Sequence, residues 1–334
     1  MSGTLPIIWS GILLLEIALY VILDGADLGI GVLSLFAKNE KQRSTMMKSI
    51  GPIWDANETW LVIAGGTLFG AFPIAYGIIL NALQIPIMLM VFGLIFRAVS
   101  FEFREHSDNK HFWSMAFAVG SIIAILGQGF ILGGLFSGIK VINGAFAGSP
   151  LGWFNPLSIL FGLGVALGYT MLGYSFLIRK TKGKLERQEY HQLRIASSIA
   201  FAMSIATTIL LPFTHDFILN KWSNAASRNI LLLFVFLAFT NFILLLRSTT
   251  EGKHENTPYT YSIVLFIITL ATLLYAVYPY MIPPTTTIFE AASGSSTLSF
   301  MLFGISILIP VVLFYNVFVH KLFDGKVDRK GGYL

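Results

Sequence analysis

The stretch that decides the fold is ILLLEIALYVILDGADLGIGVLSLF, residues 12–36. It is apolar enough to cross a membrane, since a spanning helix needs about 20 such residues. It nevertheless carries two aspartates, Asp24 and Asp27, in its second half. Charges inside a membrane are costly and usually serve a function. This stretch therefore predicts a membrane protein whose first helix contributes to a functional site.

Two further apolar stretches carry charges of the same kind. Residues 51–66, GPIWDANETWLVIAGG, contain Asp55, and residues 87–101, IMLMVFGLIFRAVSF, contain Arg97. Three aspartates and one arginine thus fall within the first three apolar stretches. Such a group distinguishes a membrane protein that couples energy from a purely apolar scaffold.

The composition is that of an integral membrane protein. Hydrophobic residues make up 55% of the 334 residues and charged residues only 12%, against about 25% in soluble domains. The mean hydropathy is +0.74. Cysteine is absent, which excludes disulfides and cysteine-ligated iron–sulfur clusters. The net charge of +5 comes from residues scattered through short loops, so nucleic-acid binding is rejected. The first apolar run lacks a basic leader and is expected to be a retained span.

The apolar runs predict helices. Each run is continuous, without the alternation of a barrel strand, and an open sheet edge cannot be satisfied in lipid. The predicted fold class is therefore an all-α integral membrane protein with about nine transmembrane helices, forming one polytopic domain over residues 1–334. The predicted helices are Ile7–Phe36, Pro52–Ile79, Ala82–Phe103, Phe112–Leu135, Pro156–Ile178, Ile195–Leu219, Ile230–Leu246, Tyr259–Met281 and Thr297–Val319.

The basic residues predict the orientation in the membrane. With nine spans, eighteen of the 22 Lys and Arg fall on one side, after the odd-numbered spans. Only Lys140, Lys221 and Arg228 fall on the other side, and Arg97 lies within a span. Because cytoplasmic loops carry the excess of Lys and Arg, we expect the N-terminus outside and the C-terminus in the cytoplasm.

Pairs of small residues predict close helix packing. Glycines four residues apart let two helix backbones approach each other. The pairs are Gly25 with Gly29, Gly66 with Gly70, Gly129 with Gly133, Gly134 with Gly138, and Gly164 with Gly168.

The charged residues are expected to share one site. On a helical wheel Glu16, Tyr20, Asp24 and Asp27 fall within about 80° of each other, so this face is expected to meet other helices or water. From the cytoplasmic ends of their spans, Asp27 lies roughly 13 Å deep, Arg97 roughly 9 Å and Asp55 roughly 4–5 Å. All therefore lie in the cytoplasmic half, where they can meet.

Two interpretations of this cluster stay open. Arg97 and one aspartate can form a buried ion pair that only holds helices together. One arginine cannot, however, neutralise three aspartates and Glu58, which shares a helix face with Asp55. Carboxylates left over in a low dielectric are expected to take up a proton or to bind a cation.

Histidine positions argue against a haem on this chain. Haem needs an axial ligand on an inward helical face, most often histidine. All six histidines lie in predicted loops or at predicted helix ends, namely His106, His111, His191, His215, His254 and His320. No nucleotide-binding glycine motif and no HExxH zinc motif occurs, and no metal site is expected in this chain.

Several sequence blocks resemble subunit II of the cytochrome bd-type quinol oxidases, including the cyanide-insensitive branch. The resemblance covers nearly the whole chain, and its most specific part is the WDxNExWLV block. The blocks are DGADLGIGVL (24–33), PIWDANETWLVIAGGTLFGAFPIAYG (52–77), FRAVSFEFR (96–104) and YPYMIPPTTTIFEAASGSSTLSFMLFGISILIPVVLFYNVF (278–318).

The resemblance implies a subunit of a bacterial terminal oxidase in the cytoplasmic (inner) membrane, which oxidises quinol and reduces dioxygen to water. In this family a haem-bearing subunit I carries two b-type haems and one d-type haem, or a third b-type haem in its place. The resemblance therefore implies that the catalytic centre lies in subunit I and that this chain contains none. Subunit II is a nine-helix partner in a pseudosymmetric heterodimer. Small accessory subunits, and a structural quinone or lipid, occur in some members.

The resemblance also assigns roles to residues. The aspartate of the WDxN motif, here Asp55 after Trp54, is implicated in proton uptake from the cytoplasm, and Glu58 would extend that path. The DGxD motif corresponds to Asp24 and Asp27, and the FR motif to Arg97. We expect Asp27 and Arg97 to form a buried ion pair, with Asp24 as a hydrogen-bonding or cation-binding partner.

Two rival functions remain. A proton-coupled secondary transporter also carries acids near the midplane, but it usually shows repeated halves, and no repeat is visible. A purely structural subunit would only stabilise a haem-bearing partner. Visible haem absorption in the purified material would exclude the transporter, and turnover of variants would separate a proton path from a scaffold.

Overall fold

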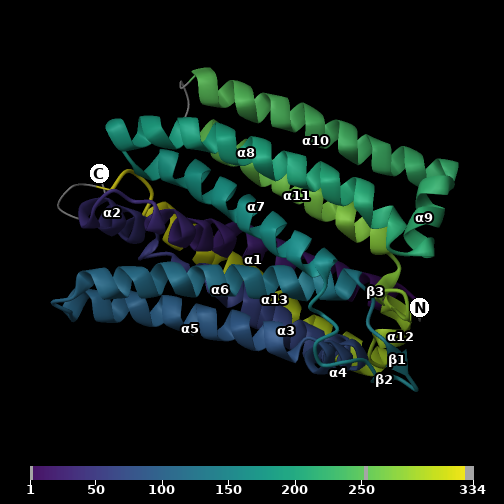
Figure 1. The fold of residues 1–334 in the computed structure, drawn as a ribbon. Coiled ribbons are helices and arrows are strands. Elements are labelled where there is room, and N and C mark those ends of the chain that lie inside the picture. Colours follow the sequence, from purple (N-terminus) through teal and green to yellow (C-terminus); the bar gives the residue numbers. More distant parts are fainter. Residues whose placement is uncertain (1–2, 252–254, 328–334) are drawn as a thin grey trace.

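The structure is a computed structural model, which describes residues 3–251 and 255–327. It is a helical bundle (Figure 1), and the predicted class of multi-helix membrane protein is confirmed. Within the described residues, eight helices are long and apolar enough to cross a membrane, or nine if one bent pair counts as a single span. The eight are α1 (Thr4–Leu35), α5 (Gln84–His106), α6 (Lys110–Phe136), α7 (Pro156–Lys180), α8 (Lys184–Leu210), α10 (Ala225–Glu251), α11 (Asn256–Val277) and α13 (Ser295–Leu322).

The bent pair corrects the predicted second span, Pro52–Ile79. The chain forms α3 (Trp54–Ala71), turns by 118° at Phe72, and continues as α4 (Pro73–Ala82). Proline lacks a backbone N–H and suits the first position of a helix, so Pro73 begins α4 and does not continue α3. Periodicity could not reveal this break, because the sequence is apolar on both sides of it.

A distant loop stabilises the break. The N–H of Ser293 donates to the carbonyl of Ala71, and its hydroxyl donates to the carbonyl of Gly70, each at 2.8 Å. These two carbonyls would otherwise be left without partners at the helix end, which is costly away from water. The next predicted span, Ala82–Phe103, corresponds to α5.

Helix α1 packs against α3, α6 and α7. Glycines make this packing possible. A Cβ at Gly29 would lie 1.9 Å from the carbonyl oxygen of Tyr169 on α7, so no side chain fits there. Gly129 and Gly133 of α6 approach the α7 backbone in the same way. The predicted role is confirmed at these glycines but not at Gly66, where an added Cβ would meet nothing within 4 Å.

The largest apolar cluster fills the space between α1, α6 and α7. Leu28, Ile30, Phe117 and Leu172 are completely buried in it. This core holds α1 rigidly, which matters because α1 carries most of the predicted site.

The two ends of the bundle differ. The chain termini lie at opposite ends (Figure 1), as an odd number of crossings requires. The end near the C-terminus holds the polar helix α2 (Glu40–Ile50), where the sequence predicted only a basic loop. The end near the N-terminus holds short elements: β1 (Val141–Ile142) paired antiparallel with β2 (Ala145–Phe146), β3 (Tyr280–Ile282) paired antiparallel with β4 (Thr286–Thr287), the 3₁₀ turn Leu211–Phe213, α9 (Asp216–Ser223) and α12 (Ile288–Ala291).

Glu40 fixes α2 to the turn between α5 and α6. Its carboxylate accepts hydrogen bonds from Arg43 at 2.9 Å, His111 at 3.0 Å, Ser114 at 3.0 Å and Arg104 at 3.3 Å. Partial burial raises the pKa of Glu40, but these four contacts outweigh it and lower the pKa to about 2.

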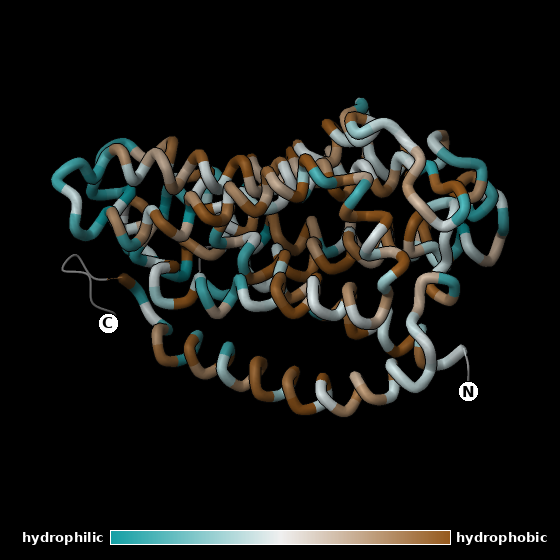
Figure 2. Tube along the Cα trace, turned by 90° about the horizontal axis from the view of Figure 1, so that it is seen from below, coloured by the Kyte–Doolittle hydropathy of each residue, from teal (hydrophilic) through white to brown (hydrophobic). Residues whose placement is uncertain are grey.

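Helix α13 runs along one side of the bundle, apart from most other helices (Figure 2). Its side chains are largely exposed, with Phe300 at 80% and Phe314 at 74%. Near one end, the indole N–H of Trp9 donates to the carbonyl of Leu298 at 3.1 Å. Near the other end, it is held by polar contacts with α3 that belong to the site described next.

Candidate functional site

Helix α1 presents one polar face to the interior of the bundle. Glu16, Tyr20, Asp24 and Asp27 are each at most 3% exposed. They are spaced by four, four and three residues, which places them on one side of a helix. The prediction that this face meets other helices and not lipid is confirmed within the chain.

Arg97 reaches this face from α5. Its Nη1 donates to Oδ1 of Asp24, and its Nη2 donates to Oε2 of Glu58 on α3 at 2.7 Å. The side chains of Arg97 and Asp24 are fully buried, whereas that of Glu58 is 24% exposed. The planar fork of a guanidinium suits two carboxylates at once. One cation thus joins α1, α3 and α5 through charge-assisted hydrogen bonds.

Trp54 covers the same guanidinium from the first turn of α3. The Cζ atom of Arg97 lies 5.7 Å from the centre of the Trp54 ring. At this distance the face of the ring attracts the positive charge of the guanidinium. The ring also stacks on Phe101 of α5, with the ring centres 5.5 Å apart. The structure therefore brings Trp54 together with the charged residues that the sequence singled out.

The expected pairing of Arg97 with Asp27 is wrong. Three residues correspond to about 60° around a helix, so Asp24 and Asp27 face different neighbours. Asp24 turns to α5 and takes the arginine, while Oδ2 of Asp27 accepts a hydrogen bond from Nδ2 of Asn57 on α3 at 2.8 Å. Without the register between helices, the sequence could not decide which aspartate meets Arg97.

The network continues to α13 through residues that the sequence analysis missed. Oδ1 of Asn57 lies 2.9 Å from Nε2 of His320, and since an amide oxygen only accepts, Nε2 must carry the proton. Nδ2 of Asn316, one turn away on α13, donates to the carbonyl of Ala56 at 3.0 Å. The signal was present in the sequence as two polar residues four apart in an apolar helix.

A second set of polar contacts lies further along α1. The hydroxyl of Thr67 on α3 donates to Oε1 of Glu16 at 3.0 Å. Gln128 of α6 donates to the Tyr20 hydroxyl at 2.7 Å and accepts from the Tyr169 hydroxyl at 2.6 Å. The buried polar column therefore extends well beyond the aspartates, and its partners on α3, α6 and α7 were not predicted.

Negative charge exceeds positive charge in this column. Among the described side chains, Arg97 is the cation that contacts Asp24 and Glu58, and Asp27 and Glu16 are each held by a neutral donor. One oxygen of each of Asp24, Asp27 and Glu16 is buried without a hydrogen-bond partner. Buried charges are stable only when paired, so this arrangement favours carboxyls that hold protons or attract a cation.

Asp55 lies outside this buried network. It is exposed in the first turn of α3, on a stripe continued by Val62, Gly66 and Phe69, while the opposite stripe carries the buried Asn57. The sequence analysis expected Asp55 and Glu58 to share one face. In the structure Glu58 points into the bundle and contacts Arg97, whereas Asp55 is exposed on the surface of the bundle. The two acids therefore lie in the same helix turn but have different surroundings.

Metal-ligating side chains do not cluster among the described residues. No group of three or more His, Cys, Asp or Glu that could hold a metal ion occurs among them. His215 contacts the carbonyl of Phe136, and His111 and His320 are held by Glu40 and Asn57. His254 lies outside the described residues.

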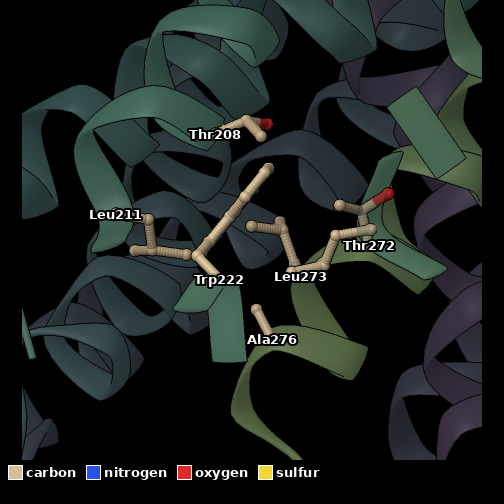
Figure 3. Close-up of a pocket in the computed structure, with 7 residues that line it drawn as sticks. Thr208, Leu211, Trp222, Thr272, Leu273 and Ala276 are labelled. Atoms are coloured by element: carbon tan, nitrogen blue, oxygen red, sulfur yellow. The ribbon is translucent and has the colours of Figure 1, made fainter. Parts of the chain in front are cut away.

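An enclosed space between α8, α9, α10 and α11 is not a cofactor site either. Figure 3 shows Thr208, Trp222 and Leu273 among its lining residues. The cavity measures about 10 Å³, which is room for no more than about one water molecule.

Comparisons with known proteins identify relatives of the whole chain. The chain is 24% identical to cytochrome bd-I ubiquinol oxidase subunit 2 of Escherichia coli K12, over 96% of this chain and 93% of that protein. It is 25% identical to cytochrome bd ubiquinol oxidase subunit 2 of Bacillus subtilis, over 93% of both. Its fold is similar to a chain of the bd oxidase from Geobacillus thermodenitrificans, with a TM-score of 0.74, 18% identity, and coverage of 94% of this chain and 98% of that one.

The family model of cytochrome bd terminal oxidase subunit II matches residues 5–323, which is nearly the whole chain. This match confirms the resemblance and does not favour the transporter alternative. On the strength of that match, the chain is a member of the cytochrome bd terminal oxidase subunit II family.

Proposed function

We propose that this chain is the second subunit of a quinol oxidase of the bd type, and that it supports quinol oxidation and dioxygen reduction to water. It would do so by stabilising a haem-bearing subunit I and by admitting protons from the cytoplasm. The observation that carries the proposal is a fully buried ion pair, Arg97 with Asp24, close to an outward-facing Asp55 that lies one turn before Glu58, the second partner of Arg97.

The partner would cover the side of the bundle formed by α3 and α13. Exposed apolar side chains gather there: Val62 is 73% exposed, Phe69 62% and Phe303 72%. Helix α13 is the least buried of the candidate spans, since only 6% of the residues in its most apolar stretch are buried within the chain. A helix so loosely packed within its own chain needs another surface, and lipid or a second subunit supplies it.

Asp55 would be the proton-uptake group. It is the acidic end of the outward stripe on α3, so it can exchange protons with water and face a partner on the same side. Glu58 lies one turn further along α3, partly exposed, and would extend the path towards the buried column. Protons taken up from one side and consumed in water formation would generate a membrane potential without a pump.

The buried cluster would fix the geometry of this path. Arg97 with Asp24 and Glu58 joins three helices, and Asp27 with Asn57 and His320 adds α13. Breaking such a network would shift the end of α3 that carries Trp54 and Asp55. In this assignment Arg97, Asp24, Asp27 and Asn57 position the uptake group, and Glu58 is the member of the cluster that also extends the proton path.

The orientation proposed for the chain has the N-terminus outside and the C-terminus in the cytoplasm of a bacterial inner membrane. It is supported by the placement of eighteen of the 22 Lys and Arg after odd-numbered spans. Two b-type haems and one d-type or third b-type haem would belong to subunit I. Accessory subunits and a structural quinone or lipid would be further components of the complex.

Co-purification tests this function. A tag on this chain is expected to recover a second, haem-bearing polypeptide with visible haem absorption and quinol oxidase activity. Recovery of this chain alone, folded and with iron porphyrin bound to it, would contradict the proposal. Recovery without any pigment and with uptake of a solute would support a transporter.

A further inference from the structure

A groove with two arginines lies between α8 and α10. It has a volume of about 340 Å³ and is lined by Arg194 of α8 and by Ile243, Leu246, Arg247 and Thr250 of α10. Figure 1 shows this part of α8 and α10 towards the end of the bundle that holds α2 and the C-terminus. Most Lys and Arg of the chain lie at this end, so the groove opens near the basic face of the membrane.

The arginines of the groove differ from Arg43, Arg104 and Arg179 on the same face. Glu40 binds both Arg43 and Arg104, and Asp324 lies 3.5 Å from Arg179. Among the described side chains, by contrast, no acid contacts Arg194 or Arg247. Arg194 contacts a neutral group, since its Nε donates to the Thr249 hydroxyl at 3.4 Å.

This contact positions the groove. Thr249 is 7% exposed and sits between the two helices, so it directs the Arg194 guanidinium across the gap towards α10. Below it, Leu193 and Leu245 are completely buried and hold the two helices together. The two cations are therefore placed on neighbouring helices above a packed apolar floor.

Apolar side chains line the groove beside the arginines. They are Ile243, which is 39% exposed, and Leu246. An acyl chain can lie along such a surface, while a phosphate at the membrane interface meets the two guanidinium groups. Basic pockets between membrane helices on the cytoplasmic side bind anionic lipid headgroups for this reason, and arginine suits phosphate because its donors form a fork.

We propose that this groove binds an anionic phospholipid from the leaflet on the side of the basic loops. The phosphate would contact Arg194 and Arg247, with Thr250 as a further hydroxyl donor, and one acyl chain would lie against Ile243 and Leu246. Charge complementarity selects this occupant over a zwitterionic lipid. The site lies on α8 and α10, away from the α3 surface proposed for subunit I.

The test uses the intact complex in detergent and native mass spectrometry. Dioleoyl phosphatidylglycerol and dioleoyl phosphatidylcholine are added in turn to wild type, to R194Q/R247Q, and to the control K182Q/R187Q. The control removes the same charge from the same side but outside the groove. We expect wild type and control to prefer phosphatidylglycerol. The groove variant should bind it roughly 25-fold more weakly, at roughly fivefold for each arginine.

Three outcomes would overturn the proposal. The first is equal phosphatidylglycerol binding by wild type and R194Q/R247Q. The second is equal weakening in the control, which would show a general charge effect. The third is complete displacement of the lipid by millimolar inorganic phosphate, which would identify a phosphate site without a lipid contribution. Ile243→Asn provides an independent check, because it should weaken lipid binding while leaving both arginines in place.

Discussion

Arg97 on α5 and Asp24 on α1 form an ion pair in which both side chains are fully buried. A buried pair costs more to desolvate than it returns unless further hydrogen bonds complete it. Glu58 supplies one of these, at 2.7 Å. The pair therefore specifies which helices meet, more than it adds net stability.

Removing the arginine alone is predicted to be severe. Arg97→Gln leaves Asp24 buried without its cation, a change that costs about 3–5 kcal/mol. We expect lower yield of the complex and an earlier loss of haem absorbance on heating. Arg228→Gln, an exposed residue at the other end of the bundle, is the matched control. Removing both charges with R97Q/D24N should recover part of the loss, and an R97Q complex as stable as wild type would contradict the assignment.

The link from α3 to α13 gives a second prediction. Asn57→Leu removes the amide that joins Asp27 to His320 and leaves both without this partner, at a cost of about 1–3 kcal/mol for each buried group. Faster backbone hydrogen exchange is expected in the last turns of α13, near Asn316. Exchange at the other end of α13, near Leu298, serves as the internal control. Unchanged exchange near Asn316 would show that α13 is held by something else.

The contacts of Glu40 predict that the stability of the protein depends on pH. Its contacts lower its pKa to about 2, so they favour the ionised form. The stabilisation is therefore present above the ordinary pKa near 4.5 and is lost as the pH falls towards 2. As the pH falls from about 4.5 to about 2, the thermal unfolding temperature of wild type should drop more than that of Glu40→Gln. The exposed Glu105→Gln is the control, and parallel curves for wild type and E40Q would refute the role of Glu40.

Glu16 is predicted to be a neutral carboxylic acid in the assembled protein. It is completely buried, its recorded donor is the Thr67 hydroxyl, and its second oxygen has no partner among the described residues. A charged carboxylate would be costly there. Infrared difference spectra of Glu16→Gln against wild type should lose a protonated-acid carbonyl band. Loss of a carboxylate band in its place would contradict the prediction.

The sequence predicted the charged residues of the site but not how they pair. Asp24, Asp27 and Arg97 stand out because apolar spans surround them, and that contrast is visible without a structure. Which aspartate meets Arg97 depends on the rotation of α1 against α5, and hydropathy carries no information about it.

Long-range partners explain the other differences. At the break beside Phe72, the hydrogen bond to the carbonyl of Gly70 comes from Ser293, 223 residues away. The side-chain oxygen of Asn57 accepts its hydrogen bond from His320, 263 residues away. Local patterns cannot contain such pairs. The helices themselves were predictable because each must satisfy its own backbone within lipid.

The outward position of Asp55 is likewise a matter of helix rotation. Asp55 and Glu58 are three residues apart, so a wheel places them on one face, about 60° apart. Only the packing of α3 shows that Glu58 turns to Arg97 while Asp55 stays exposed. The uptake proposal depends on that difference.

Steady-state oxygen consumption by the Asp55→Asn complex, with haem content measured on the same sample, tests proton uptake through this chain most directly. The account predicts normal haem content and a turnover lowered roughly tenfold or more, as expected when a positioned proton-transfer group is removed. Asp55→Glu should retain part of the activity, and the exposed Asp108→Asn should behave as wild type. Normal haem content with unchanged turnover in Asp55→Asn would contradict the account.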